Sequence, residues 1–203
     1  MPANLRESLV DEIKDLYNAE KQIVKALPKM VKGATSDELR EAFESHLEET
    51  ENQVTRLERV FELLDEKPRG KHCAGMAGIL EEGSDILQED AEDVVMDAML
   101  IAGAQKVEHY EITAYGTAIA WAEALGLSEV AQVLGESLAE SGINDAETAG
   151  ESEDEMDEED EDESDSRSTR SSEPAGAAAR SASGAGRSSN GATKSTRQRG
   201  GRR

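Results

Sequence analysis

Apolar residues recur every three or four positions through most of the first 148 of the 203 residues, which is the spacing of one buried helix face. A first helix is predicted over about residues 4–32, with a stripe formed by Leu9, Ile13, Leu16, Ile23, Leu27 and Met30. Gly33-Ala34-Thr35 should end this helix, and Ser36 should cap a second helix that runs to about residue 66. The predicted buried face of the second helix contains Leu39, Phe43, Leu57 and Leu64.

The second half of this region repeats the arrangement of two long helices. A glycine-interrupted connection over residues 71–90 should contain one short helix, about 77–88. A third long helix is expected over 92–125, and Ser128 should cap a fourth that fades near residue 148. The predicted buried face of the third helix contains Val94, Ala98, Ile101, Ile112 and Ile119. Two helical hairpins joined by one long crossover predict an all-α protein, a ferritin-like antiparallel four-helix bundle over residues 1–148.

Residues 149–203 have a different composition and are predicted to be a disordered low-complexity tail. Residues 151–165 are almost all Asp and Glu, and residues 166–203 are mainly Ser, Gly, Ala and Arg. Neither part has enough apolar surface to offset the entropy lost on ordering the chain.

The net charge of −23 limits the partners that the protein can bind. The tail carries 13 acidic and 9 basic residues, which leaves a net charge of −19 on residues 1–148. Such a surface repels nucleic acid and anionic membranes, so nucleic acid is expected only as a weak partner of the Arg-rich terminus. The charge suits a salt-adapted host, in which screening weakens self-repulsion, and an ordinary acidic protein is the alternative.

Cysteine content and hydropathy indicate a cytoplasmic protein. The single cysteine, Cys73, allows no disulfide within the chain and fits a reducing compartment. The amino terminus has no apolar signal core, and no apolar run reaches the roughly 20 residues that a membrane helix needs.

One acidic residue, Glu20, interrupts the apolar stripe of the first helix. A buried carboxylate is costly unless it is paired or binds a metal ion. In the alternative interpretation, the helix is slightly rotated and Glu20 reaches solvent.

Further acidic residues fall at matching heights in the two hairpins. Residues equidistant from the turn of an antiparallel hairpin lie level, so Glu20 should face Glu49, and Glu111 should face Glu140. Each pair is separated by 29 residues, and the second pair lies 91 residues after the first. His46 and Glu108 each lie three residues, about one helical turn, before one of these acids.

These six residues form a candidate metal site, although their alignment in a chain with 45 acidic residues could also be a coincidence. Two divalent cations would neutralise four or five carboxylates at one level. Carboxylates with one imidazole suit iron or manganese, and zinc is a common alternative. The predicted ligands are Glu20, His46, Glu49, Glu108, Glu111 and Glu140, with Glu108 either a ligand or a neighbour that positions one.

At these positions residues 4–145 resemble the YciE/YciF family of ferritin-like proteins. The matching stretches are 16–22 (LYNAEKQ), 46–51 (HLEETE), 107–112 (VEHYEI) and 114–116 (AYG). The resemblance implies a helical bundle, usually dimeric, with a di-metal centre and a ferroxidase-like or stress-linked role. Two features differ from the usual di-iron pattern: His46 precedes Glu49 rather than following it, and the last helix has Ser137 before Glu140, then Ser141-Gly142.

The expected function is that of a di-iron protein with ferroxidase-like activity. One alternative is a non-catalytic dimeric stress protein whose metal only stabilises the fold, and another is a nucleic-acid-associated protector. His109 is expected to point outward, and His72 with Cys73 lacks the spacing of a zinc site. Three tyrosines near the centre are expected to pack, and the alternatives are a hydrogen bond to a ligand or a radical-quenching role: Tyr17, Tyr110 and Tyr115.

Overall fold

The computed structural model describes residues 2–142 and 144, and the predicted tail at 149–203 and the boundary at residue 148 lie outside these residues. The described chain is helical. Its elements are α1 (Leu5–Gly33), α2 (Asp37–Leu63), α3 (Ala74–Ile86), α4 (Asp93–Ala124) and a last helical segment over residues 128–142.

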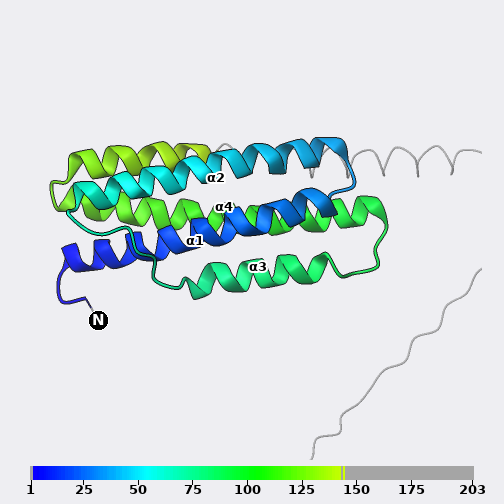
Figure 1. Ribbon diagram of the computed structural model, residues 1–203, viewed down its shortest axis with the longest axis horizontal. Helices are drawn as coiled ribbons and strands as arrows, with labels where there is room; N and C mark the ends of the chain where they lie inside the picture. Colours follow the sequence, from blue (N-terminus) through cyan, green and yellow to red (C-terminus); the bar gives the residue numbers. More distant parts are fainter. Residues whose placement is uncertain (1, 143, 145–203) are drawn as a thin grey trace, which may run out of the picture.

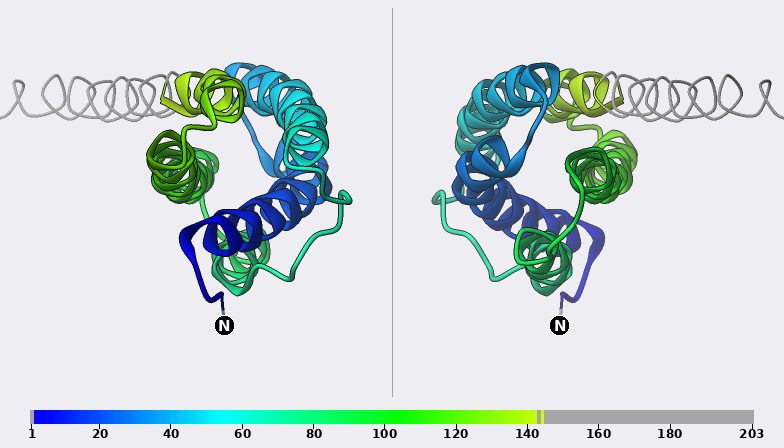
Figure 2. Two further views of the ribbon diagram at one scale, coloured as in Figure 1. Left: turned by 90° about the vertical axis from the view of Figure 1, so that its left-hand side faces the viewer. Right: turned by 90° about the vertical axis from the view of Figure 1, so that its right-hand side faces the viewer.

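The four long helices form an antiparallel bundle (Figure 1). α1 and α2 make one hairpin, and α4 and the segment 128–142 make the other (Figure 1). The crossover between the hairpins contains α3, which packs outside the bundle against α1 and α4 (Figure 2). This arrangement confirms the predicted ferritin-like bundle with a short extra helix in its crossover.

The helix ends follow from local capping chemistry. The Asn4 side chain accepts a hydrogen bond from the backbone N–H of Glu7 (2.9 Å), and the Ser36 hydroxyl accepts one from Leu39 (3.2 Å). Ser36 is therefore the predicted cap of α2. Ser128, in contrast, is the first helical residue, because the Leu127 carbonyl already accepts the N–H of Ala131.

The short helix begins three residues earlier than predicted, at Ala74. The Cys73 sulfur accepts the backbone N–H of Met76 (3.3 Å) and so caps α3, which a pattern of apolar spacing does not reveal. At the other end of the preceding connection, α2 stops at Leu63, and Asp65 adopts a positive φ of 56°.

A buried aspartate, Asp97 of α4, fixes the turn between α1 and α2. Its carboxylate accepts the backbone N–H of Thr35 (2.7 Å), the hydroxyl of Thr35 (2.8 Å) and the backbone N–H of Ser36 (2.8 Å). These bonds link the first hairpin to the start of α4. The turn of the second hairpin depends on Gly126, whose φ of +73° favours glycine.

The predicted buried face of α4 was wrong at the start of the helix. Val94 is 46% exposed, Ala98 is exposed, and Ile112 and Ile119 are only half-buried. Apolar residues surround this end of α4, so their spacing does not select one face. The three hydrogen bonds of Asp97 set the rotation instead. The buried apolar residues of α4 are Leu100, Ile101, Val107, Ala114, Tyr115, Ala118 and Ala122.

The apolar core consists of two clusters along the bundle axis. One cluster takes buried residues between 9 and 17 of α1, between 57 and 64 at the end of α2, and between 114 and 122 of α4, with Val130 and Leu134 of the last helical segment. The other takes buried residues between 19 and 34 in α1 and the turn after it, 39 and 43 of α2, 73 and 76 at the start of α3, and between 100 and 107 of α4. Buried acidic side chains at positions 20, 108 and 111 lie between these apolar clusters, together with His46.

None of the helices in the described part of the chain is both long enough and apolar enough to cross a bilayer.

Candidate metal centre

The centre brings together three helices. Glu20 comes from α1, His46 from α2, and Glu108 and Glu111 lie one turn apart on α4. The exposed fractions are 0% for Glu20, 7% for His46, 1% for Glu108 and 0% for Glu111. Four of the predicted ligands are thus inside the bundle, and Glu20 does not reach solvent.

Three of these side chains converge closely enough to hold one cation. One ligand atom from each of His46, Glu108 and Glu111 lies within 4.8 Å of the others. His46 Nε2 is 3.1 Å from Glu108 Oε1. Burial lowers the pKa of His46 to about 4, so the imidazole is neutral at pH 7 and this contact is not an ion pair.

The donor atoms of the centre fit a metal ion because, when the carboxylates are ionised, no hydrogen-bond donor reaches them. His46 Nε2, Glu20 Oε2, Glu108 Oε2 and both oxygens of Glu111 are buried without a hydrogen bond. Buried polar atoms are nearly always paired, and leaving them unpaired costs free energy. A divalent cation with an imidazole and carboxylates as ligands would satisfy them, and iron, manganese and zinc all suit this set.

The carboxyl groups hold protons near neutral pH when no metal is bound. Burial raises the pKa of Glu20 to about 7 and that of Glu108 to about 8. Burial and the negative charge of Glu20 raise the pKa of Glu111 well above its ordinary value. Any cation that binds must therefore displace protons, and its affinity should increase with pH.

Tyr115 holds one of these carboxylates in place. Its buried hydroxyl donates a hydrogen bond of 2.7 Å to Glu20 Oε1. This leaves Glu20 Oε2 as the oxygen without a partner. The other two tyrosines bond elsewhere: Tyr17 donates to Glu58 (2.7 Å), and Tyr110 donates to Asp15 (3.0 Å).

Glu49 and Glu140, the other two predicted ligands, are half-buried and have protein partners. Asn144 donates a hydrogen bond to Glu49 (2.9 Å). Arg56 makes two hydrogen bonds of 2.5 Å with the carboxylate of Glu140. Both carboxylates are near enough to affect the centre electrostatically, since Glu49 raises the pKa of Glu108 and Glu140 raises that of Glu20.

The two hairpins supply matching residues at an offset of 91 positions. Glu20 matches Glu111, and Glu49 matches Glu140. Gln53 matches Asn144, and each amide contacts the outer carboxylate of the other hairpin: Gln53 contacts Glu140 (3.5 Å) and Asn144 contacts Glu49 (2.9 Å).

The correspondence between the two hairpins breaks down at two positions of the centre. The position of His46 is taken by Ser137, and the position of Glu108 is taken by Tyr17. Glu140 is held by a guanidinium, whereas His46 and Glu108 retain unpartnered atoms. We name the two sides the His46 half (His46, Glu49, Glu108, Glu111) and the Arg56 half (Glu20, Arg56, Ser137, Glu140).

Residues 4–159 match a protein family described as a domain of unknown function, DUF892. Protein YciF of Escherichia coli K12 is 39% identical over 142 residues, which cover 70% of this chain and 86% of YciF. The chain belongs to the YciE/YciF family.

Two solved structures show the same fold. The structure of the E. coli stress protein YciF has 35% identity and a TM-score of 0.75, and the match covers 77% of this chain and 99% of that chain. YcfI of Rhodopseudomonas palustris has 42% identity and a TM-score of 0.71, with 72% and 93% covered. The resemblance inferred from the sequence is therefore confirmed for family and fold.

Sequence reasoning missed the partners of the outer carboxylates in this YciE/YciF family member. Arg56, Gln53 and Asn144 were not identified as part of the centre. Gln53 could have been found, because it is polar and lies two turns after His46 on the same face of α2. Arg56 could not, because basic residues are common on exposed helix surfaces.

The remaining candidates lie outside the centre. His72 and His109 are exposed. Cys73 is buried, and its sulfur is 3.0 Å from the hydroxyl oxygen of Tyr110.

Proposed function

We propose that this protein binds divalent metal ions, above all iron, in the buried carboxylate centre, and that it oxidises Fe(II). The observation that carries the proposal is the set of five buried donor atoms without partners on Glu20, His46, Glu108 and Glu111. Manganese and zinc are the other ions that this donor set accepts.

The two halves would hold two ions by different ligands. His46, Glu108 and Glu111 would hold the first ion, and Glu49 could reach it if it left Asn144. Glu20 and Glu140 would hold the second, and Glu140 would first have to leave Arg56. Bound iron supplies electrons for the reduction of an oxidant.

The side chains of this chain would orient the ligands and move protons. Tyr115 would hold Glu20 through the Oε1 atom and keep Oε2 directed to the ion. Glu20, Glu108 and Glu111 would release protons when an ion binds. In the overall reaction, O2 takes up two electrons from two Fe(II) ions together with two protons and leaves as H2O2.

The proposal is tested by anaerobic loading with Fe(II), metal analysis and measurement of O2 consumption. We expect bound iron and oxidation faster than that of free Fe(II) in matched buffer, and we expect Glu49→Gln to slow it. Glu44→Gln, a change at an exposed position on the same helix, is the control. Absence of bound metal at any pH between 6 and 9 would refute the proposal.

A structural metal is the second candidate, and the burial of the unpaired carboxylates favours it as well. An ion would then neutralise Glu20, Glu108 and Glu111 and stabilise the bundle. If the protein binds metal but oxidises Fe(II) no faster than buffer does, the structural role is the function that remains. The solved E. coli relative is described as a stress protein, and either function fits a role in stress.

A further inference from the structure

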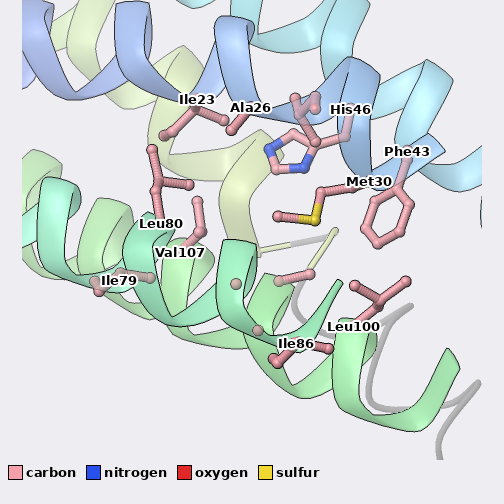
Figure 3. Close-up of a pocket in the computed structure, with 14 residues that line it drawn as sticks. Ile23, Ala26, Met30, Phe43, His46, Ile79, Leu80, Ile86, Leu100 and Val107 are labelled. Atoms are coloured by element: carbon pink, nitrogen blue, oxygen red, sulfur yellow. The ribbon is translucent and has the colours of Figure 1, made fainter. Parts of the chain in front are cut away.

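A small apolar pocket lies beside the proposed centre, between α1, α3 and α4 (Figure 3). Fourteen residues line it: four each from α1, α3 and α4, and two from α2. Among their side chains, His46 alone carries a nitrogen or oxygen atom. Figure 3 shows its imidazole directed toward the same space as Met30 and Val107.

The pocket is too small for an organic substrate. Its free volume is about 30 Å³, whereas one water needs roughly 10–15 Å³ measured in the same way. It therefore has room for a molecule of only a few atoms. Small apolar cavities tend to stay dry, because water inside them finds too few hydrogen-bond partners.

The pocket leads to a ligand of the centre through His46. Nε2 of this residue is 3.1 Å from Glu108 Oε1, and Val107, which also lines the pocket, directly precedes Glu108. A molecule in the pocket would lie against the imidazole that completes the proposed site of the first ion.

We propose that this pocket delivers dioxygen to the centre and disfavours hydrogen peroxide. The inference rests on the proposed function and specifies its oxidant. Dioxygen is small and apolar, so its transfer from water into an apolar pocket costs little free energy. Peroxide has two hydroxyl groups, and the pocket offers them one imidazole, so its transfer costs the free energy of unpaired polar groups.

Binding of dioxygen is tested without any metal. The metal-free full chain, labelled at Leu and Ile methyl groups, is placed under O2 pressure, and paramagnetic relaxation of the methyl protons is measured. We expect larger enhancements at Ile23, Leu27 and Leu100, which line the pocket and are buried, than at the buried Leu9 and Leu57 of the other core cluster. Equal enhancements at both sets would overturn the proposal.

Delivery is tested by filling the pocket. A Cβ atom at Gly103 would lie 3.9 Å from Ile86 Cδ1, an ordinary contact, so Gly103→Leu should add bulk without backbone strain. Gly116→Leu on the same helix is the matched control, because no atom lies within 4 Å of its Cβ position. Circular dichroism shows whether both variants keep the fold.

We expect Gly103→Leu to slow oxidation of bound Fe(II) by O2 several-fold, and to leave oxidation by H2O2 and the iron content unchanged. An unchanged O2 rate in a folded Gly103→Leu would overturn delivery through this pocket. If neither oxidant reacts faster than with free Fe(II), the proposed oxidase function fails, and the relaxation experiment still decides whether dioxygen enters. If Gly103→Leu does not fold, the relaxation experiment alone decides.

Discussion

The His46 half and the Arg56 half of the centre occupy matching positions in the two hairpins but balance their negative charge differently. In the Arg56 half, a guanidinium makes two short hydrogen bonds with Glu140. In the His46 half, a neutral imidazole and two carboxylates leave buried atoms unpaired. One half therefore carries its own cation, whereas the carboxyl groups of the other hold protons near neutral pH when no metal is bound.

This difference predicts two ions of unequal affinity. The first ion would enter the His46 half and replace protons. The second would have to separate Glu140 from Arg56, whose side chains are 28% and 24% exposed. A partly exposed ion pair of this kind contributes about 1 kcal/mol, which is enough to change affinity about fivefold.

The largest effect should come from Glu20→Gln, because Glu20 lies where the two halves meet. The amide oxygen can still accept the hydrogen bond of Tyr115, but the charge that attracts cations is lost. We expect the second ion to be lost and the first to bind more weakly, because Glu20 also acts on Glu111 electrostatically, so that metal content falls by half or more while the helical signal stays intact. Metal analysis with circular dichroism checks this, and wild-type metal content would exclude Glu20 from the site.

A matched pair of substitutions should separate the halves. His46→Ala removes a ligand and is expected to abolish binding of the first ion, whereas Ser137→Ala at the corresponding position should change affinity about twofold or less. Titration calorimetry with Mn(II) or Zn(II) measures both. Equal losses in the two variants would show that the asymmetry does not control binding.

Arg56→Gln should release Glu140 for a metal ion. We expect the second ion to bind roughly fivefold more tightly, and the metal-free protein to lose about 1 kcal/mol of unfolding free energy because Glu140 no longer has a compensating charge. Stoichiometric titration and chemical denaturation measure the two effects. Weaker binding of the second ion would mean that Arg56 supports the site rather than competing with it.

The smallest effect concerns pH. The folded-state pKa values of Glu20 (about 7) and Glu108 (about 8) lie above the ordinary value of 4.5. At pH values between 4.5 and these folded-state values, the folded protein therefore binds more protons than the unfolded chain. Stability from this source is full below pH 4.5 and is lost as pH rises toward 8. The pKa of His46, lowered to about 4, acts in the opposite direction: it makes stability fall as the pH drops below about 6.5.

We therefore expect the melting temperature of the metal-free protein to fall by a few degrees between pH 6.5 and 8.5. Glu108→Gln should reduce the fall, and Glu44→Gln should not. Thermal scans without metal measure it. Metal affinity should change in the opposite direction, because fewer protons must be displaced at high pH. A melting temperature that increases over this range would contradict the protonated centre.

The sequence by itself determined the helical bundle and the most unusual position in its core. The apolar stripe of α1 is narrow, so its interruption by Glu20 was visible, and Glu20 is fully buried. The equal spacing of the hairpins related Glu20 to Glu111 and Glu49 to Glu140, because heights along an antiparallel hairpin follow from residue numbers alone.

The tertiary structure decided rotations and partners. Apolar residues surround the start of α4, so only the hydrogen bonds of Asp97 to the α1–α2 turn show which face is buried. Likewise, Glu49 and Glu140 have equal heights in the sequence pattern, yet Asn144 binds one and Arg56 the other. Periodicity records which residues share a face of one helix, whereas charge compensation depends on side chains that meet across helices.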